Sequence, residues 1–411
     1  MTEPTRAAGL ARLAAFVPRA GRAYRATRNE DRGPDDRTNV SMLAPYVRTR
    51  LITEEEILRA VLAAHPFAAA EKFVQEVFWR TYWKGWLEAR PGAWRDYRRE
   101  LARLRERFED DADLRRSYEA AIEGRSGIPA FDAWASELVR YGYLHNHARM
   151  WFASIWIFTL RLPWELGADF FMRHLLCGDP ASNTLSWRWV AGLHTRGKTY
   201  LATRGNIREY TRDRLDPGPR LATHAEPLDG PQYPAAPLPE LRPEVPPGTR
   251  ALLVLHDDDV ALPALREGAA LVSAAGLSAA RGRSPEPARG PLAFARGALA
   301  DALTRAPGGD PAAIVDGCEP AAAAAALGER ARTAGVSTIV TPFAPVGPVR
   351  DALDALEPLL AARGVELVRV ASAYDAAAWP LATRGFFQFK EKIPQLVRRL
   401  AAPSGEPAAA P

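Results

Sequence analysis

Hydrophobic residues recur at intervals of three and four through most of the first 215 residues, which is the period of an amphipathic helix. In "ITEEEILRAVLAAH", Thr53 followed by three glutamates is typical of a helix N-terminus. A long helix is predicted through "EKFVQEVFWRTYWKGWLEAR", ending at the "PG" of residues 91–92. Further helices are expected over residues 98–123, 129–142, 145–160, 165–176 and 204–213. This half of the chain is therefore predicted to be all α.

The pattern changes after residue 248, where short β-branched runs alternate with Ala- and Leu-rich helical stretches such as "GPVRDALDALEPLLAARG". The runs are "RALLVLHDDD", "AALVSA", "AAIVDG", "VSTIVTP" and "VELVRVA". Strands that alternate with helices predict a parallel, Rossmann-like sheet covered on both faces. Because no glycine-rich phosphate motif follows any of these runs, the predicted sheet has no nucleotide fingerprint of its own.

The two halves are joined by residues 224–248, which contain eight prolines and no sustained period. Such a segment is expected to form an extended, semi-rigid linker. The predicted organisation is an all-α domain over residues 1–223, the linker, an α/β domain over residues 249–402 and a disordered tail over residues 403–411.

The two halves also differ in charge and in aromatic content. Residues 1–225 hold 36 Lys and Arg against 28 Asp and Glu, whereas the remainder holds 18 against 21. Ten of the eleven tryptophans lie in the first half, and Trp379 is the exception. A basic, aromatic-rich half is typical of proteins that bind a polyanion or a planar ligand. The alternative is that a GC-rich genome has raised the arginine content and that the aromatic side chains form the core.

The chain has only two cysteines, Cys177 and Cys318, and no run of 18 apolar residues. Too few thiols are present for a disulfide framework, which favours a reducing compartment, and we expect a cytoplasmic protein without a membrane span. His145 and His147 would point to opposite sides of a helix, and "HDDD" at 256–259 is expected to be a solvated loop at a strand end. No metal site is therefore predicted.

One face of the long helix combines unusual chemistry. Glu76, Trp79, Arg80 and Trp83 are spaced i, i+3, i+4 and i+7, so a carboxylate, a guanidinium and two indoles share a face. This composition is poor for a plain core, although an amphipathic helix with an ordinary Glu–Arg pair remains the alternative.

Two further segments place polar groups beside apolar ones. In "GYLHNHARMWFASIWIF", Asn146, Arg149 and Met150 share a face with Ala153. In "GDPASNTLSWRWVAG", Asp179 and Pro180 would begin a turn or a first helical turn, after which Asn183 and Trp187 share a face and Trp189 points away. Helices that converge with these faces inward would line a pocket.

These segments together resemble a known family. The FAD-binding helical domain of DNA photolyases and cryptochromes has the same motifs in the same order, namely "AYRATRNED", "VSMLAPYVRTR", "QEVFWRTYWKGW", "YGYLHNHARMWFAS", "LPWELGADFF" and "GDPASNTLSWRWVAG". The resemblance covers most of residues 8–215 and is nearest to the cyclobutane pyrimidine dimer photolyases. It implies a mainly α domain of this type, bound FAD and damaged DNA as the partner.

The resemblance implies a role for each matching residue around FAD. The phosphates would be bound by Tyr24 and by the loop Val40, Ser41, Met42, Leu43 and Ala44. The isoalloxazine and adenine rings would be surrounded by Arg80, Asn146, Arg149, Cys177, Asp179 and Asn183. Among these, Asn183 would be the partner of flavin N5, as is usual in repair enzymes.

The same resemblance implies a substrate site and an electron relay. A flipped-out lesion would be held by Glu76, Trp79, Asn146, Met150 and Trp189, with Arg28 and Arg80 at phosphate or cavity contacts. Asn146 favours the cyclobutane class, since the (6-4) class has His at this position. Trp187 and Trp164 match the first two tryptophans that relay electrons to the flavin.

The chain departs from the family pattern at three places. Asp111 stands at the third relay position, so Trp156, Trp94 or Trp134 would have to substitute. Cys177 replaces an Asp that pairs with the arginine corresponding to Arg149. In the phosphate loop, Val40 and Ala44 replace hydroxyl residues, and the neighbouring Thr38 and Asn39 could compensate.

Domain order is also unusual, because the α/β antenna domain of the family precedes the helical domain. Here "LLVLHDDDVALPAL" and "WPLATRGFFQFKEKIP" faintly resemble the start and exit of that domain, which suggests a permuted photolyase with an unassigned antenna chromophore. The leading hypothesis is light-driven repair of cyclobutane dimers by reduced FAD. The alternatives are a cryptochrome-like photoreceptor or another flavoprotein without repair activity, and a helical nucleic-acid-binding protein without a cofactor.

Overall fold

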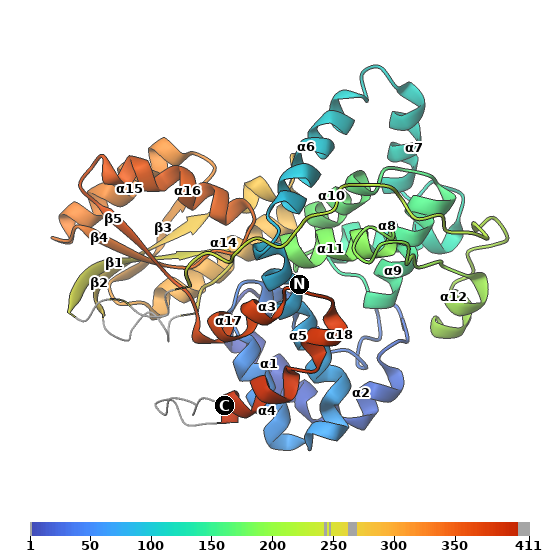
Figure 1. Ribbon diagram of the computed structural model, residues 1–411, viewed down its shortest axis with the longest axis horizontal. Coiled ribbons are helices and arrows are strands. Elements are labelled where there is room, and N and C mark those ends of the chain that lie inside the picture. Colours follow the sequence, from blue (N-terminus) through green and yellow to red (C-terminus); the bar gives the residue numbers. More distant parts are fainter. Residues whose placement is uncertain (1, 242–244, 246–247, 262–268, 402–411) are drawn as a thin grey trace.

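The computed structural model describes residues 2–241, 245, 248–261 and 269–401. The first half is helical, as predicted, and the sheet forms a separate layer to one side of it (Figure 1). The helices of this half are α1 (Arg6–Phe16), α2 (Arg22–Thr27), α3 (Ala44–Arg48), α4 (Glu54–Ala64), α5 (Phe67–Glu88), α6 (Gly92–Glu106), α7 (Ala112–Ile122), α8 (Pro129–Tyr141), α9 (Asn146–Ser154), α10 (Trp164–His174), α11 (Pro180–Val190) and α12 (Arg204–Tyr210). None of the described helices is long and apolar enough to cross a membrane.

The helix boundaries follow local chemistry. Thr53 and Glu56 form a capping box at the start of α4, as the sequence pattern indicates. The single helix predicted over residues 98–123 is wrong, because Asp111 accepts a hydrogen bond from the Leu114 amide at 2.9 Å and begins a new helix. The helix predicted over residues 145–160 ends at Ser154 and continues as a π-helical turn, Ile155–Thr159.

Helix α11 begins with the helical turn expected at Asp179 and Pro180 and extends to Val190. Asp179 caps it by accepting from the Ser182 amide at 2.7 Å, and Pro180 occupies its first position. Eight of its eleven residues are buried. Because this helix is enclosed on most sides, its sequence has no clear amphipathic period.

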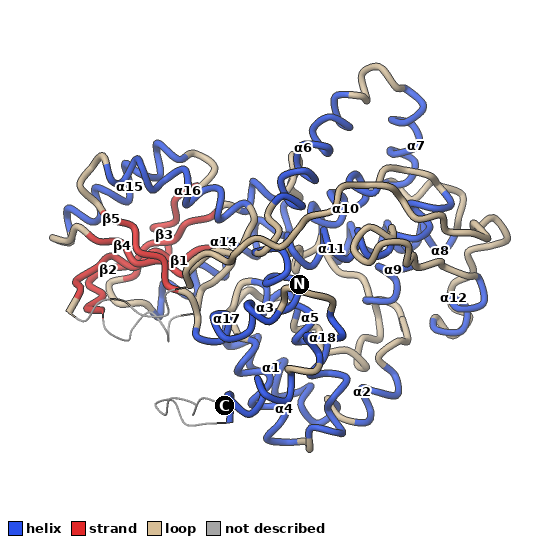
Figure 2. Tube along the Cα trace, viewed as in Figure 1, coloured by secondary structure: helices blue, strands red, loops and turns tan. Residues whose placement is uncertain are grey.

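The second half contains a five-stranded parallel sheet, as predicted. Its strands are β1 (Thr249–His256), β2 (Ala269–Ser278), β3 (Gly309–Asp316), β4 (Thr338–Pro342) and β5 (Glu366–Val370), in the order β3-β2-β1-β4-β5. On β1, Leu253 and Leu255 pack with α14 (Arg289–Arg305), while Leu252 and Val254 pack with α15 (Pro320–Thr333) and α16 (Pro348–Ala361). Alternate residues of one strand thus serve opposite faces, and both faces are covered (Figure 2).

Two segments tie the sheet layer to the helical half. The described linker residues have no helix or strand and run along the helices, where the Leu228 amide donates to Ala191 O at 3.0 Å and the Ala236 amide donates to Ala89 O at 2.8 Å. At the other end of the chain, α17 (Ala373–Ala378), α18 (Phe386–Lys390) and α19 (Ile393–Ala401) pack on α4 and α5 (Figure 1). The chain therefore returns to the helical half, and the predicted tail of residues 403–411 lies outside the described residues.

The "HDDD" segment is not a solvated loop, contrary to the sequence-based expectation. His256, Asp257, Asp258 and Asp259 are all buried. Asp258 forms an ion pair with Arg48 of α3 at 2.5 Å, which brings a buried cation from the helical half to the end of β1. Charged residues can be buried when they are paired, and a sequence pattern does not reveal a partner some 200 residues away.

Candidate functional site

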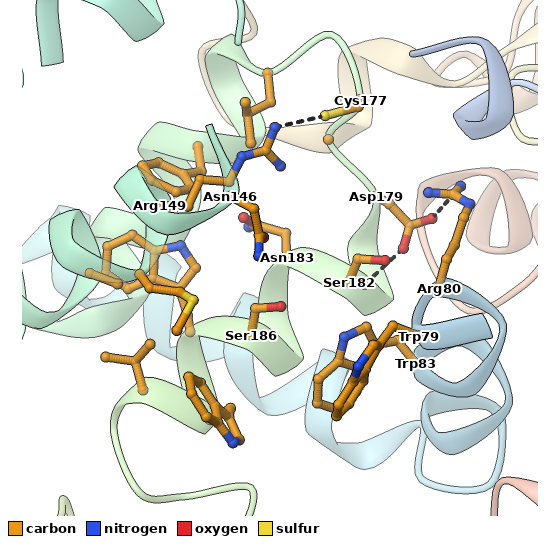
Figure 3. Close-up of a pocket in the computed structure, with 18 of the residues that line it drawn as sticks. Trp79, Arg80, Trp83, Asn146, Arg149, Cys177, Asp179, Ser182, Asn183 and Ser186 are labelled. Atoms are coloured by element: carbon orange, nitrogen blue, oxygen red, sulfur yellow. Dashed lines mark hydrogen bonds and ion pairs between the residues drawn. The ribbon is translucent and has the colours of Figure 1, made fainter. Parts of the chain in front are cut away.

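A cavity of about 460 Å³ opens among α5, α9, α10 and α11 (Figure 3). The helical faces singled out in the sequence meet there. Its wall includes the residues Glu76, Trp79, Arg80, Trp83, Asn146, Arg149, Met150, Ala153, Cys177, Asp179, Asn183, Trp187 and Trp189. Trp189 was expected to point away from the face of Asn183, but both line this cavity, and Trp189 stacks on Tyr200 at 5.9 Å.

The wall formed by α5 carries three ion pairs. Arg80 contacts Asp179 at 3.1 Å and Glu54 at 3.4 Å, so it joins α5 to the start of α11 and to α4. Glu76, one turn earlier, pairs with Arg28 just after α2. The carboxylate of Glu76 is therefore held at the cavity by a cation from another helix.

Asp179 is a buried carboxylate of this wall whose pKa is lowered by several nearby cations. Burial alone would raise the pKa of its carboxyl, but the charges of Arg80, Lys84 and Arg48 outweigh burial and hold this pKa well below its usual range. Asp179 is thus ionised at all physiological pH values. It serves both as the cap of α11 and as the anchor of Arg80 (Figure 3).

The hydrogen-bond and ring partners of Arg149 are Cys177, Leu144 and Tyr143 rather than a carboxylate. Its Nη2 donates to Cys177 Sγ at 3.3 Å, its Nε donates to Leu144 O at 3.0 Å, and its guanidinium lies 5.6 Å from the centre of the Tyr143 ring. Among the described residues no carboxylate pairs with Arg149, so a ligand in the cavity can neutralise its positive charge.

Asn183 is oriented by the backbone of the neighbouring helix. Its Nδ2 donates to Ala168 O at 2.8 Å, which fixes the side-chain amide. Among the described residues nothing donates to Asn183 Oδ1, so this oxygen is available to accept a hydrogen bond from a ligand N–H in the cavity.

A second cavity of about 280 Å³ adjoins the first, because Glu76, Asn146 and Met150 line both. Its other walls come from α2, from the residues that precede α9 and from the predicted phosphate loop, with the lining residues Tyr24, Arg28, Val40, Ser41, Met42, Leu43 and Ala44 among them. The two cavities together fall in the usual size range of ligand pockets, roughly 300–1,000 Å³.

The loop in the second cavity is suited to an anion. Met42 has a φ of 55°, in the left-handed region, which turns successive amides toward one side. Within the described residues the backbone amides of Ser41, Met42 and Ala44 donate no hydrogen bond. Three free amides, the Ser41 hydroxyl and the nearby Arg28 offer donors to a phosphate despite the missing hydroxyls at positions 40 and 44.

The two histidines before and in α9 have structural partners. His145 Nε2 lies 3.0 Å from Arg28 O, and His147 Nδ1 lies 2.9 Å from Asn29 O, so both rings hold the end of α2. Burial lowers the pKa of His145 to about 4, which keeps it neutral. The described residues contain no group of three or more His, Cys, Asp or Glu side chains arranged to hold a metal ion.

Comparison with known proteins shows which proteins the helical half is similar to. A family model described as the FAD binding domain of DNA photolyase matches residues 73–215. A deoxyribodipyrimidine photo-lyase of Streptomyces griseus is 34% identical over 38% of this chain and 32% of its own length. An enzyme of the same name from Thermus thermophilus is 32% identical over 49% of this chain and 46% of its own length. Residues 73–215 therefore belong to a domain that is similar to the FAD-binding domain of DNA photolyase.

The match is partial in both directions, since the chain spans less than half the length of either relative. A solved class III photolyase from Agrobacterium tumefaciens is 24% identical, covers 51% of this chain and 43% of that chain, and has a TM-score of 0.43. FAD is the cofactor of this photolyase-type domain. The polar groups described above fit FAD. They are the amide-rich loop for the phosphates, the Arg149 guanidinium and the acceptor oxygen of Asn183.

The aromatic packing in the photolyase-type domain departs from the relay that the resemblance implies. Trp187 contacts Trp156 at 6.1 Å, and Trp164 contacts Tyr97 at 5.6 Å. No ring contact joins Trp164 to Trp187 among the described residues. Asp111, at the third relay position, caps α7 and pairs with Arg107 at 2.9 Å. Trp156 is thus the indole in ring contact with Trp187.

Several residues that line the cavity were missed by the sequence analysis, namely Phe171, Leu175, Gly178, Ser182, Ser186, Val190 and Phe387. The helical period of α11 could have identified Ser182 and Ser186, which lie near Asn183 on consecutive turns. Phe387 belongs to α18 in the second half of the chain, and no local pattern could have placed it there.

Gly167 on α10 is required by the packing of Trp187. A Cβ at this position would lie 2.3 Å from Trp187 Cη2 and 2.9 Å from Trp156 Cε2. We expect Gly167→Ala to lower the free energy of unfolding by about 1–3 kcal/mol and to displace the indole that borders the FAD cavity. Urea unfolding and the amount of bound flavin measure these effects.

Gly205→Ala is the matched control, because a Cβ at Gly205 on α12 meets nothing within 4 Å. In a helix this exchange is expected to be neutral or to stabilise by up to about 1 kcal/mol. Equal stability of the two variants would contradict the close packing of Gly167.

Proposed function

We propose that this protein repairs cyclobutane pyrimidine dimers in DNA with light, using reduced FAD. The observation that carries the proposal is a single cavity lined both by the residues that the resemblance assigns to FAD and by those it assigns to the lesion. Glu76, Trp79, Asn146 and Met150 belong to the second group, and they share that wall with Asn183. An extruded dinucleotide would then lie beside the cofactor. We also propose that the α/β domain is the counterpart of the antenna domain, placed after the helical domain instead of before it.

The residues of the adjoining cavities would hold FAD between them. The loop from Val40 to Ala44 and Arg28 would bind its phosphates, Asn183 Oδ1 would accept from a ring N–H, and Arg149 would neutralise the polar edge of the ring. When bound and reduced, FAD supplies an electron to the pyrimidine dimer after excitation by light. All other tasks fall to the chain, which must extrude, orient and polarise the lesion.

Glu76 would orient the lesion and Arg28 would supply positive charge. An ionised carboxylate accepts hydrogen bonds, so Glu76 can take one from a pyrimidine N–H, whereas a bond to a pyrimidine carbonyl requires that Glu76 carry a proton. Arg28, paired with Glu76, brings a cation to the place where negative charge develops. Extruding a dinucleotide costs a few kcal/mol, and stacking on aromatic side chains, about 1–3 kcal/mol per base, offsets this cost.

One observation favours the second candidate, a photoreceptor without repair activity, because it limits how a lesion can stack on Trp79. Phe386 stacks on Trp79 with the ring centres 3.4 Å apart and an angle of 11° between the planes. One face of this indole is therefore already covered, and a base can stack on Trp79 only from the other side.

The proposal is tested on the full-length protein purified in the dark. We expect a flavin absorbance band, and we expect illumination of the reduced protein with a dimer-containing oligonucleotide to restore intact pyrimidines. Glu76→Gln should slow repair by about a hundred-fold, since it removes the charged acceptor that would orient the reacting base and the ion pair that holds Arg28, while leaving the flavin content unchanged.

Glu71→Gln, five residues earlier on α5 and outside the cavity, is the control and should repair at the wild-type rate. Flavin without repair would select the photoreceptor, and a protein without flavin would overturn both candidates.

A further inference from the structure

Helix α18 directs one aromatic ring inward and the next outward. Phe386 is 7% exposed and stacks on Trp79. Phe387 is 83% exposed and nevertheless is one of the residues that line the 460 Å³ cavity. Consecutive residues of a helix point about 100° apart, so the buried ring fixes the direction of the exposed one.

The exposure of Phe387 is unusual in this molecule. The other large apolar side chains that are exposed in the described residues are 37–51% exposed, and Val139 has the highest of these values. A single exposed apolar residue needs no explanation by itself. Its place at the mouth of a ligand cavity is the second observation, and it indicates a residue that a ligand covers.

The backbone around Phe387 is anchored to α5. Tyr82 Oη donates to Arg384 O at 2.9 Å, and Arg90 Nη2 donates to Thr383 O at 2.7 Å. On the other side, Phe389 is fully buried against Phe78 and Tyr82. The exposed ring therefore stands on a rigid support, so little conformational entropy is lost when it is covered.

The surroundings favour a nucleic-acid base as the covering group. Any base presents a flat face to a phenyl ring, and such stacking does not depend on sequence. The exposed side chains of Arg384 and Lys392 flank α18 in sequence and supply positive charge for a phosphate backbone. Because Phe387 lies at the cavity mouth, the base it can reach is next to an extruded dinucleotide rather than part of it.

We propose that Phe387 stacks on a DNA base adjacent to the extruded lesion and replaces the stacking that this base loses when the dinucleotide leaves the helix. This inference rests on the proposed repair function, and it adds a substrate contact from the C-terminal part of the chain. The FAD-binding residues take no part in it.

The test uses full-length protein with bound FAD, kept in the dark so that no repair occurs. Its substrate is a duplex with one cyclobutane dimer and 2-aminopurine as the adjacent base. We expect Phe387→Ala to weaken binding of this duplex about ten-fold and to raise the fluorescence of the 2-aminopurine, since stacking quenches it. Phe387→Trp should restore both, and the flavin content of all variants should equal that of the wild type.

Val139→Ala is the matched control, since Val139 is 51% exposed on α8 and does not line the cavity. Wild-type affinity in Phe387→Ala, together with a wild-type preference for the dimer, would overturn the stacking role and leave the repair function standing. If the wild type binds duplexes with and without the dimer equally well, both the stacking role and the repair function are overturned. A self-associating wild type that Phe387→Ala makes monomeric would show that a second copy covers the ring, and this too would overturn the inference.

Discussion

Replacing Arg50 with methionine is expected to lower the free energy of unfolding by about 3–5 kcal/mol, because it removes a cation that is in direct contact with several buried carboxylates. Arg50 is 6% exposed and contacts Asp259 at 2.7 Å, Asp375 at 2.6 Å and Glu54 at 3.2 Å. These carboxylates come from the end of β1, from α17 and from α4. One guanidinium therefore joins the sheet layer, the C-terminal helices and the helical half.

The backbone conformation of Arg50 is also consistent with a large loss of stability on its replacement. Its φ is 55°, a left-handed conformation that costs a non-glycine residue roughly 1–2 kcal/mol. Methionine keeps this cost but loses the three ion pairs. Burial alone would lower the pKa of Arg50, but Asp375, Glu54 and Asp259 raise it well above its ordinary value, so the guanidinium remains charged.

The loss should depend on pH in a defined direction. Without Arg50 the stranded carboxylates would have a higher pKa in the folded than in the unfolded protein, so the deficit is greatest at pH 8 and shrinks as acid protonates them. Urea unfolding at pH 5 and pH 8 measures it. The control is Arg204→Met, whose ion pair with Asp216 is half exposed and screened by solvent, so its loss should change the stability little. An equally small, pH-independent loss in Arg50→Met would contradict the role of this residue.

Asp257→Asn is expected to stabilise the protein relative to the wild type at pH 8 but not at pH 4. Burial and the neighbouring Asp258 together raise the pKa of Asp257 to about 7, although Arg48 acts in the opposite direction. Between about pH 4 and pH 7 the folded protein keeps this proton and the unfolded chain releases it, so the stability of the wild type falls as the pH rises. Each pKa unit corresponds to about 1.4 kcal/mol, and the whole effect is on the order of 4 kcal/mol.

The asparagine can keep the hydrogen bonds of the aspartate. Asp257 Oδ2 accepts from the Ala279 amide at 2.6 Å and from Ser278 Oγ at 3.2 Å, and an amide oxygen can do the same. Asp216→Asn is the control, because the hydrogen bond from Arg204 lowers the pKa of Asp216 to about 2, so this carboxyl is ionised in the folded protein from pH 4 to pH 8 and the effect of the exchange should change little with pH. This prediction is tested by measuring the free energies of unfolding of the wild type and both variants from pH 4 to pH 8. A difference for Asp257→Asn that does not change with pH would show that Asp257 is ionised.

These charges occupy a place where α/β proteins usually bind ligands. The crevice at the carboxyl ends of parallel strands is widest where the strand order reverses, which here is between β1 and β4. His256 at the end of β1 contacts Pro342 O at the end of β4 at 2.9 Å, and Arg48 and Arg50 pair with the aspartates that follow. At this edge of the sheet, two arginines of the helical half therefore occupy the place where α/β proteins usually bind a ligand.

Much of the fold could be predicted because it is local. Alternation of β-branched runs with helices identified the parallel sheet, and the Thr53 capping box marked α4. The same locality explains the errors. Asp111 divided a predicted helix because a short-range cap competed with the longer helical period, and the extent of α11 was not predicted because a helix enclosed on most sides has no clear hydrophobic stripe.

The candidate site was predictable where a helix repeat places side chains on one face. Glu76, Trp79, Arg80 and Trp83 share a face at any tertiary arrangement of α5, and they all line the cavity. The partners of this face were not predictable. Arg28 pairs with Glu76 across 48 residues and Asp179 pairs with Arg80 across 99, and no spacing rule connects residues so far apart.

The sequence by itself determined the composition of the site, namely the carboxylate, indole and amide side chains on three helical faces, because the period of a helix depends only on the backbone. Only the tertiary structure decided what those groups meet. It gave Arg149 a thiol as its partner, buried Asp257 and its two neighbouring aspartates against Arg48 and Arg50, and brought Phe387 to the mouth of the cavity. Burial and charge pairing depend on which surfaces pack together, and that choice is made by the whole chain.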